Sequence, residues 1–309
     1  MPVFNEFYFE SNTGKNTLYA LRCTPDGEAR GVVQIAHGIA DHIDRYRDFM
    51  LFLAENGFVV TGNDHLGHGK SIQGIDEQGF FAEENGWDYV VADMDKLHDM
   101  TTADFPGLPY VMFGHSMGSF LTRTYVIKHP DKYDAVILSG TGHQTKAMVD
   151  AGYAMSSAAV KLYGPRKLGV MLNDIAFGAY NKGYDNVRTE FDWVCSNPDS
   201  VDKYIADPFC GFVARVSVYR DMMGGIKFIT NPRNIEKMDK SKPVYFFSGA
   251  CDPVGENGAG VTRAYNAFCK AGLRDVFMRL YPGGRHEMLN ETNKQDVYND
   301  VLNWLNEKI

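Results

Sequence analysis

The sequence predicts an α/β fold built on a mostly parallel sheet, and three observations lead to this prediction. Short apolar runs typical of buried strands alternate with segments whose apolar residues recur at helical spacing. One such run, Tyr110–Phe113, passes directly into Gly114-His115-Ser116-Met117-Gly118, and a helix-period stretch follows through Lys128. The alternation stops after Ser139 and resumes at Val244, a gap of roughly 100 residues where an α/β connection usually takes a handful. We therefore expect a sheet covered by helices on both faces and interrupted by one long insertion.

The composition is typical of a globular protein with a full core, because 44% of the 309 residues are hydrophobic and 23% are charged. The net charge of -8 argues against a nucleic-acid partner, which would require a basic face, and provides no attraction to anionic lipid. No apolar run approaches the length of a membrane span, and the N-terminus lacks the pattern of a secretory signal. The five cysteines are scattered without a C-x-x-C pair, which predicts reduced thiols in a cytoplasmic protein without zinc or disulfides.

The first 23 residues favour an antiparallel hairpin. Two strand-like runs, Phe4–Phe9 and Leu18–Cys23, are joined by the turn-forming segment Asn12-Thr13-Gly14-Lys15-Asn16.

The alternating core begins after Gly31. Asn56-Gly57 ends the first helix of the core, and His129-Pro130 ends the helix after the serine motif, since the residue before a proline disfavours helical geometry. The expected strands are Val32–Ala36, Phe58–Thr61, Tyr110–Phe113, Ala135–Ser139, Val244–Ser248 and Val276–Tyr281, and the expected helices lie at Tyr46–Leu53, Trp87–Leu97, the stretch up to Lys128, Val261–Cys269 and Val297–Leu305.

The long insertion is predicted to be a helical cap rather than an independent domain, because the sheet pattern resumes after it. We expect the core to comprise residues 1–140 and 240–309, with the cap at residues 141–239. The insertion is rich in Tyr, Phe, Met and Ala, and its helix-like pieces are separated by Pro165, Pro198, Pro208 and Pro232.

The motif around Ser116 predicts a catalytic nucleophile. A serine between a strand and a helix lies on a strained turn, and the glycines at 114 and 118 let the two arms of that turn approach each other. The same turn places the backbone N–H of Met117 beside the hydroxyl, as one donor of an oxyanion hole. The alternative is a chance G-x-S-x-G in a glycine-rich chain, which the strand–turn–helix setting makes less favourable.

A serine nucleophile requires a base and an acid that orients the base, and in this topology they follow in the order Ser, Asp or Glu, His. Asp252 follows the strand Val244–Ser248, and His286 is the only histidine after residue 143. Asp275 is a rival acid, but it precedes its strand and would lie at the wrong end of the sheet. Glu287, next to the base, is expected to support its loop, and a surface histidine is the alternative for His286.

The second oxyanion donor is expected in His37-Gly38-Ile39, the loop after the first parallel strand. Gly38 would allow the backbone to turn the N–H of Ile39 toward the serine. The alternative is that His37-Gly38 only ends the strand.

Together these segments resemble the monoglyceride lipase and lysophospholipase branch of the serine α/β-hydrolases. The resemblance rests on HGIADH, DHLGHGKS, GHSMG, the D-P-V after the seventh strand and RHEMLNE. It implies an α/β-hydrolase fold, a triad of Ser116, Asp252 and His286, and oxyanion amides from Ile39 and Met117. Ile39 and Asp41 depart from the pattern, since animal monoglyceride lipases carry a small residue and a glutamate there; a bulkier Ile39 would narrow the acyl entrance.

Three other features have alternatives. Asp64, His65 and His68 could suggest a metal site, but the resemblance makes them a hydrogen-bonded loop beside the active site, so no metal is expected. His115 is expected to be buried support rather than a second base. The apolar segment Met148–Tyr163 fits cap packing and a lipid-facing wall equally well, and the second alternative would bring the cap into transient contact with a lipid surface.

The sequence thus predicts a cytoplasmic serine carboxylic-ester hydrolase that acts through an acyl-enzyme on an apolar acyl ester, such as a monoacylglycerol or a lysophospholipid. No cofactor and no nucleic-acid partner are expected, and the oligomeric state is left open. Acyl transfer through the same triad is one alternative, and a non-catalytic ligand-binding protein on this fold is another.

Overall fold

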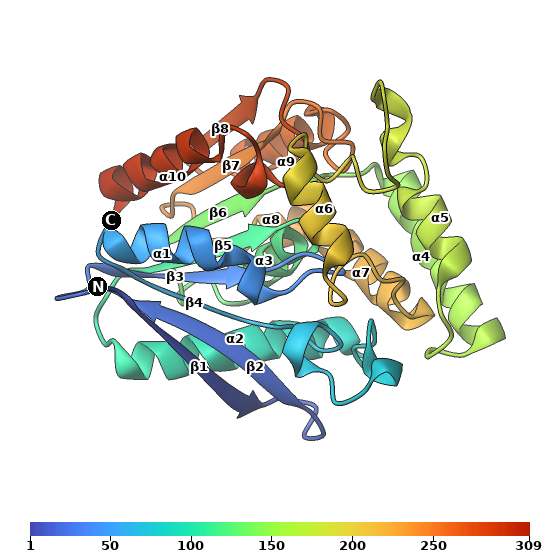
Figure 1. Cartoon of the computed structure of the whole chain (residues 1–309), viewed down its shortest axis with the longest axis horizontal. Coiled ribbons are helices and arrows are strands. Elements are labelled where there is room, and N and C mark those ends of the chain that lie inside the picture. Colours follow the sequence, from blue (N-terminus) through green and yellow to red (C-terminus); the bar gives the residue numbers. More distant parts are fainter.

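The protein, described over residues 1–309 by a computed structural model, is built on one eight-stranded sheet with the order β1-β2-β4-β3-β5-β6-β7-β8 (Figure 1). The first two strands form the predicted antiparallel hairpin, and β2 also pairs antiparallel with β4. All other neighbours are parallel, which confirms the predicted fold class. The strands are β1 (Val3–Glu10), β2 (Thr17–Thr24), β3 (Gly31–Ala36), β4 (Phe58–Asn63), β5 (Tyr110–His115), β6 (Ala135–Ser139), β7 (Val244–Gly249) and β8 (Val276–Tyr281).

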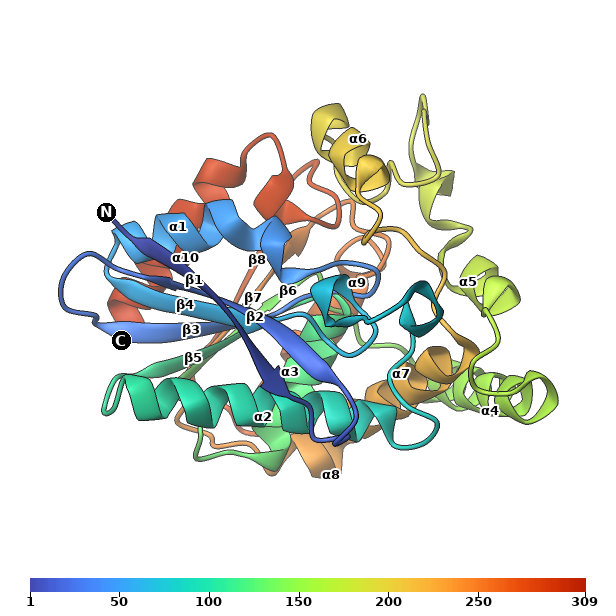
Figure 2. The same cartoon turned by 60° about the horizontal axis from the view of Figure 1, so that its bottom comes forward.

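Helices cover both faces of the sheet, as the uninterrupted apolar strands require. Figure 2 shows α1 (Arg47–Glu55) and α10 (Lys294–Lys308) on one face, with α2 (Gly86–Asp104) and α3 (Met117–Lys128) on the other. Successive strand residues point to opposite faces: Met112 joins the apolar core under α2 and α3, whereas Phe113 joins the core under α1 and α10. Also on the α3 side is α9 (Ala259–Lys270).

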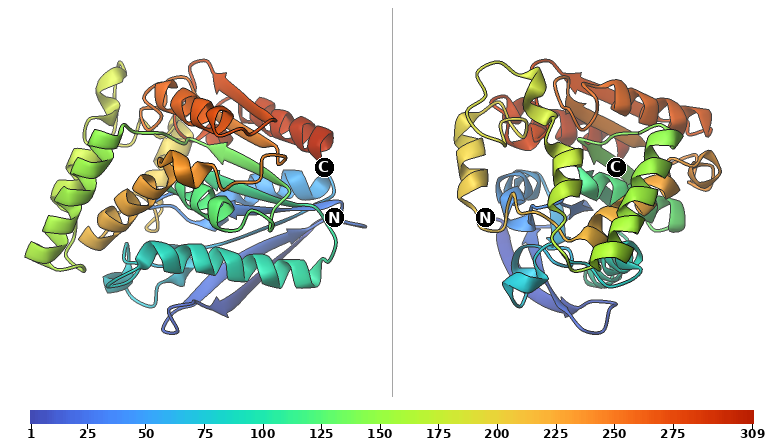
Figure 3. Two further views of the ribbon diagram at one scale, coloured as in Figure 1. Left: turned by 180° about the vertical axis from the view of Figure 1, so that it is seen from behind. Right: turned by 90° about the vertical axis from the view of Figure 1, so that its right-hand side faces the viewer.

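The chain between β6 and β7 is helical, as predicted. Its elements are α4 (Lys146–Tyr163), α5 (Val170–Phe177), the 3-10 turn η4 (Tyr180–Gly183), α6 (Pro198–Ala206), α7 (Val216–Ile229) and α8 (Pro232–Ile235). Figure 3 shows α4 at the side of the molecule away from both chain termini.

The last long helix of this segment, α7, contacts both the outer helix and the body of the protein. It packs against α4 on one side and against α2 and α3 on the other, and Val218, Met222 and Ile226 belong to the main apolar core. The helix α7 thus joins the outer helices to the core. Because it belongs to both, the predicted cap boundaries at residues 141 and 239 stay a prediction.

No helix is both long enough and apolar enough to span a membrane.

Candidate active site

Ser116 lies in a tight turn between the end of β5 and the start of α3. Its backbone has φ 54° and ψ −123°, a region that side-chain-bearing residues rarely adopt. An added Cβ at Gly114 would lie 2.5 Å from the carbonyl oxygen of Gly118, and one at Gly118 would lie 2.0 Å from the carbonyl oxygen of Ala36. Only glycine at both positions lets α3 approach β3 and β5 this closely, and that approach is what projects Ser116 from the sheet.

Asp252 and His286 meet at the same edge of the sheet, from the loops after β7 and β8. Nδ1 of His286 lies 3.0 Å from Oδ2 of Asp252, and both side chains are buried. The Asp252 carboxylate also accepts hydrogen bonds from the Ser248 hydroxyl at 3.0 Å and the Val254 N–H at 2.9 Å, which hold it in one orientation.

The electrostatics of this pair favour a positively charged imidazole beside a carboxylate. Burial by itself lowers the pKa of His286, but the attraction and hydrogen bond of Asp252 outweigh it, so the pKa is raised. Burial alone would raise the pKa of Asp252, whereas the attraction of His286 leaves it lowered. The rival acid Asp275 pairs with Lys308 of the C-terminal helix instead, at 2.8 Å.

The imidazole of His286 lies over the start of the turn that follows β6, the strand next to the one that leads into Ser116. A Cβ added at Gly140 would be 2.9 Å from Cε1 of His286 and 3.1 Å from Cε1 of His115. The rings of His115 and His286 are 4.7 Å apart, and Nδ1 of the buried His115 lies 3.2 Å from the Ser139 hydroxyl. His115 is thus buried and packs against the ring of His286, in agreement with the expected supporting position.

The loop after β3 passes directly beside Ser116. A Cβ added at Gly38 would lie 3.2 Å from Cβ and 3.6 Å from Oγ of Ser116. Ile39 follows in this loop and lines the same cavity as Ser116 and Met117. Met117 is the first residue of α3, so its N–H has no partner within the helix.

Arg45 connects this loop to the loop of His286, a role that the sequence analysis missed. Its guanidinium donates to Oδ1 of Asp41 at 2.8 Å and to both carboxylate oxygens of Glu287 at 2.7 and 2.6 Å. Asp41 in turn accepts from the Gly38 N–H at 3.3 Å and the Tyr46 hydroxyl at 2.8 Å. The only signal in the sequence is an arginine four residues after Asp41, and its partner lies 242 residues away.

The histidine-rich loop DHLGHG is a buried support for the site. The Asp64 carboxylate accepts the N–H groups of Ile43 and Lys70, each at 2.7 Å. Burial lowers the pKa of His65 to about 3 and that of His68 to about 4, so both rings are neutral near pH 7. This is the hydrogen-bonded loop that the family resemblance implied.

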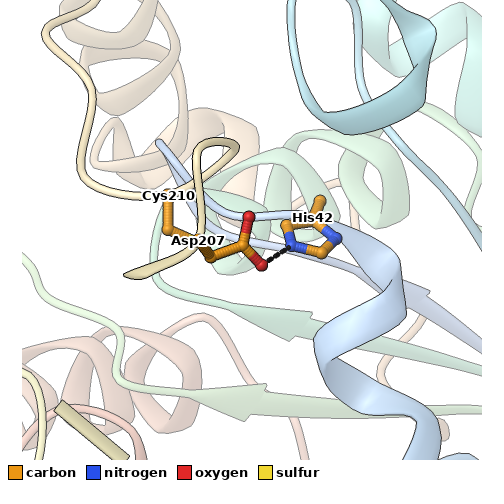
Figure 4. Close-up of side chains that lie close together, drawn as sticks. All are labelled: His42, Asp207 and Cys210. Carbon is orange, nitrogen blue, oxygen red and sulfur yellow. Dashed lines mark hydrogen bonds and ion pairs between the residues drawn. The ribbon is translucent and has the colours of Figure 1, made fainter. Parts of the chain in front are cut away.

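Two other clusters contain side chains of the types that bind metal ions, namely histidine, aspartate and cysteine. Figure 4 shows His42, Asp207 and Cys210, whose ligand atoms lie within 4.8 Å of one another. Nε2 of His42 is hydrogen-bonded to Oδ2 of Asp207 at 2.8 Å, and burial raises the pKa of the Cys210 thiol, which favours its protonated form.

The second cluster, Asp95, His98 and Asp99, already holds a cation of the protein itself. The Lys132 ammonium donates to Asp95 and Asp99, each at 2.8 Å. We therefore assign hydrogen-bonding and ion-pairing roles to both clusters.

An apolar cavity of about 400 Å³ opens at Ser116, and we call it the acyl cavity. Hydrophobic residues make up 16 of its 22 lining positions. They come mainly from α4, α5 and α7, with others from α3, η4 and the loops after β3 and β7, and they include Ile39, Met148, Met155, Phe177 and Met222.

Comparison with known proteins gives one family and a consistent group of relatives. The family model described as serine aminopeptidase, S33, matches residues 27–293. A monoacylglycerol lipase of Mycolicibacterium smegmatis is 27% identical over 91% of this chain and 90% of its own, and the human monoglyceride lipase is 21% identical over 96% and 89%.

Among solved structures, a thermostable carboxyl esterase from Bacillus coagulans in complex with glycerol has a TM-score of 0.92 at 29% identity, with 99% of both chains covered. A soluble variant of the Saccharomyces cerevisiae monoglyceride lipase has a TM-score of 0.76 at 20% identity, covering 99% of this chain and 96% of its own, and shows a shared fold.

Gly118→Ala should destabilise the protein by about 3 kcal/mol, because the new methyl group would collide with backbone that cannot move without separating α3 from β3. Chemical denaturation of both proteins measures the difference. Gly183→Ala is the matched control, since nothing lies within 4 Å of its added Cβ. Equal stability of the Gly118 variant and the wild type would show that the turn does not depend on this contact.

Proposed function

Since the chain belongs to the serine aminopeptidase S33 family and is a serine ester hydrolase of the monoglyceride lipase type, we propose that it cleaves monoacylglycerols. The proposed reaction passes through an acyl-enzyme on Ser116. One observation carries the proposal: a cavity with a mostly apolar lining begins at a serine in a strained turn, beside a buried Asp–His pair. The lysophospholipid alternative has weaker support, because a probable lysophospholipase L2 from Haemophilus influenzae matches only 45% of this chain.

In the proposed mechanism His286 takes the proton of Ser116 as Oγ attacks the ester carbonyl carbon. The Asp252 carboxylate holds the proton on Nδ1, so that Nε2 is the basic nitrogen, and it stabilises the imidazolium that forms. The backbone N–H groups of Ile39 and Met117 donate to the oxyanion. His286 then gives its proton to the departing alcohol oxygen, and the acyl group remains on Ser116.

Deacylation repeats these steps with water. His286 removes a proton from water as the water oxygen attacks the acyl carbon, and the proton returns to Ser116 Oγ as the fatty acid leaves. The bridge from Asp41 through Arg45 to Glu287 connects the loop of Ile39 to the loop of His286, so both loops keep their positions through the two half-reactions.

We propose that residues 141–239 act as the cap that sets acyl selection, because α4, α5 and α7 supply most of the apolar wall opposite Ser116. We also propose that this cap meets a lipid surface transiently. The support is a group of exposed apolar side chains on α4 and α5, comprising Met148, Leu162, Tyr163, Met171 and Ile175. Five free thiols support the proposal of a cytoplasmic location.

Ser116→Ala should lower kcat for monoacylglycerol hydrolysis by about 10⁶-fold, because the substitution removes the attacking oxygen. The melting temperature should stay close to that of the wild type. Ser157→Ala, a serine of α4 that does not line the acyl cavity, is the control and should keep its activity. Retention of kcat in the Ser116 variant would exclude it as the nucleophile.

The rate should fall on the acid side as His286 becomes protonated, with an apparent pKa above its ordinary value of about 6.5. Asp252→Asn should lower kcat by about 10⁴-fold, since the base loses its tautomer. It should also shift the acid limb to lower pH, because the attraction of Asp252, the largest effect that raises the His286 pKa, is lost while the lowering effect of burial remains. Profiles of kcat and kcat/KM from pH 4 to 9 measure both effects. An acid limb that does not shift in the variant would show that the limb is not caused by titration of His286 beside Asp252.

Lengthening the acyl chain should raise kcat/KM until the cavity is full. Each buried methylene should lower the activation free energy for kcat/KM by about 0.8 kcal/mol. Met155→Asp places a charge on the cavity wall and should therefore reduce turnover of long-chain esters more than that of acetate esters. Ala158→Asp is the control, because this exposed position on the same helix neither lines the cavity nor belongs to the exposed apolar group. Equal losses of turnover on long-chain and short-chain esters would show that this wall does not contact the acyl chain.

A further inference from the structure

A second cavity of about 360 Å³ adjoins the acyl cavity, and we call it the alcohol compartment. The two cavities share Ile39, Phe177 and Tyr219 in their walls. The inference that follows rests on the proposed function, since it assigns the part of an ester substrate that this second cavity receives.

The position of the alcohol compartment relative to the base identifies that part. Trp193 lines the compartment, and its ring centroid lies 5.3 Å from that of His286. The departing alcohol must receive its proton from His286, so it has to leave on the side of the imidazole. The acyl chain then occupies the larger apolar cavity, and the alcohol occupies the compartment beside Trp193.

The lining of the alcohol compartment is aromatic and negatively charged. Asp174 and Glu190 supply two carboxylates, and none of the fifteen lining residues is a lysine, an arginine or a histidine. The aromatic side chains are Phe177, Phe191, Trp193, Tyr204, Phe212 and Tyr219.

Neither carboxylate is neutralised by the protein. Asp174 and Glu190 take part in none of the ion pairs within 4.0 Å, although the chain forms such pairs at many other carboxylates. The nearest cation to one of the rings is Arg45, 4.8 Å from the Tyr204 centroid, and its charge is paired with Asp41 and Glu287. Aromatic faces together with unpaired carboxylates are the lining that attracts an organic ammonium ion.

We propose that the alcohol compartment selects cationic alcohols, so that the enzyme hydrolyses esters of quaternary ammonium alcohols faster than their uncharged isosteres. The chemistry is the hydrolysis described above: the acyl C–O bond breaks, water supplies the new carboxyl oxygen, and the proton from His286 completes the alcohol. The ammonium charge is fixed throughout and contributes only through its attraction to the walls.

Matched esters test this assignment. Butyrylcholine and 3,3-dimethylbutyl butyrate have the same shape and differ in one atom, nitrogen against carbon, and therefore in one positive charge. The wild type should show a kcat/KM about tenfold higher for the choline ester, the attraction expected from two partly solvated carboxylates and aromatic faces. Raising the salt concentration should reduce this ratio, because the carboxylates are exposed and screened.

Asp174→Asn combined with Glu190→Gln should lower the ratio clearly toward one, because only the aromatic faces then attract the positive charge. Asp185→Asn removes an exposed carboxylate of the same segment that lines neither cavity, and it should leave the ratio unchanged. A wild-type ratio of one or less, or an unchanged ratio in the double variant, would overturn the proposal.

Two further measurements separate this proposal from the proposed function. Turnover of p-nitrophenyl butyrate reports ester hydrolysis with an alcohol that carries no ammonium. If the wild type does not hydrolyse this ester, the result counts against the proposed function alone. Calorimetric titration of the Ser116→Ala protein with the two butyrate esters measures binding without turnover. Tighter binding of the choline ester, by a similar factor, supports the compartment, and equal binding contradicts it.

Discussion

The close approach of α3 to the sheet is the constraint on which the rest of the site depends. At Gly118 a methyl group would lie only 2.0 Å from the carbonyl oxygen of Ala36, so the helix meets the strand backbone to backbone. This contact forces Ser116 into its positive φ, and it places the start of α3 next to the loop that carries Gly38 and Ile39. One packing contact thereby positions the serine and both expected oxyanion donors.

A buried set of charged side chains then fixes the loop after β3 relative to the loop of His286. Arg45 is shared by Asp41 and Glu287, and all three side chains are largely removed from water. Removing one partner of such a set leaves a buried charge unpaired, which is costly, so the set favours one arrangement of the two loops. It joins the loop after β3 to the loop after β8, although β5, β6 and β7 lie between these two strands in the sheet.

Much of the fold, and the placement of Ser116, Asp252 and His286 at one edge of the sheet, could be predicted because most of the signals are local. The serine motif and the strand periodicity are each contained in a few consecutive residues, and Asp252 and His286 each follow directly after a recognisable strand. The role of Arg45 could not be predicted, since its partner Glu287 is brought near only by the folded sheet. The same holds for Trp193, whose neighbour His286 lies 93 positions later, and for α7, whose apolar residues serve both the outer helices and the core. The alcohol compartment could not be predicted for the same reason, because only the folded chain brings Asp174 and Glu190 into one cavity with the aromatic rings.

The proposed mechanism is tested most directly by a crystal structure of the protein after reaction with a p-nitrophenyl ester of a long-chain alkyl phosphonate, which releases p-nitrophenol as phosphorus bonds to the serine. We expect a phosphorus atom bonded to Oγ of Ser116 and a phosphonyl oxygen within hydrogen-bonding distance of the N–H groups of Ile39 and Met117. The alkyl chain should lie in the acyl cavity between α4, α5 and α7. Phosphorus on another side chain, or an alkyl chain in the compartment beside Trp193, would contradict it.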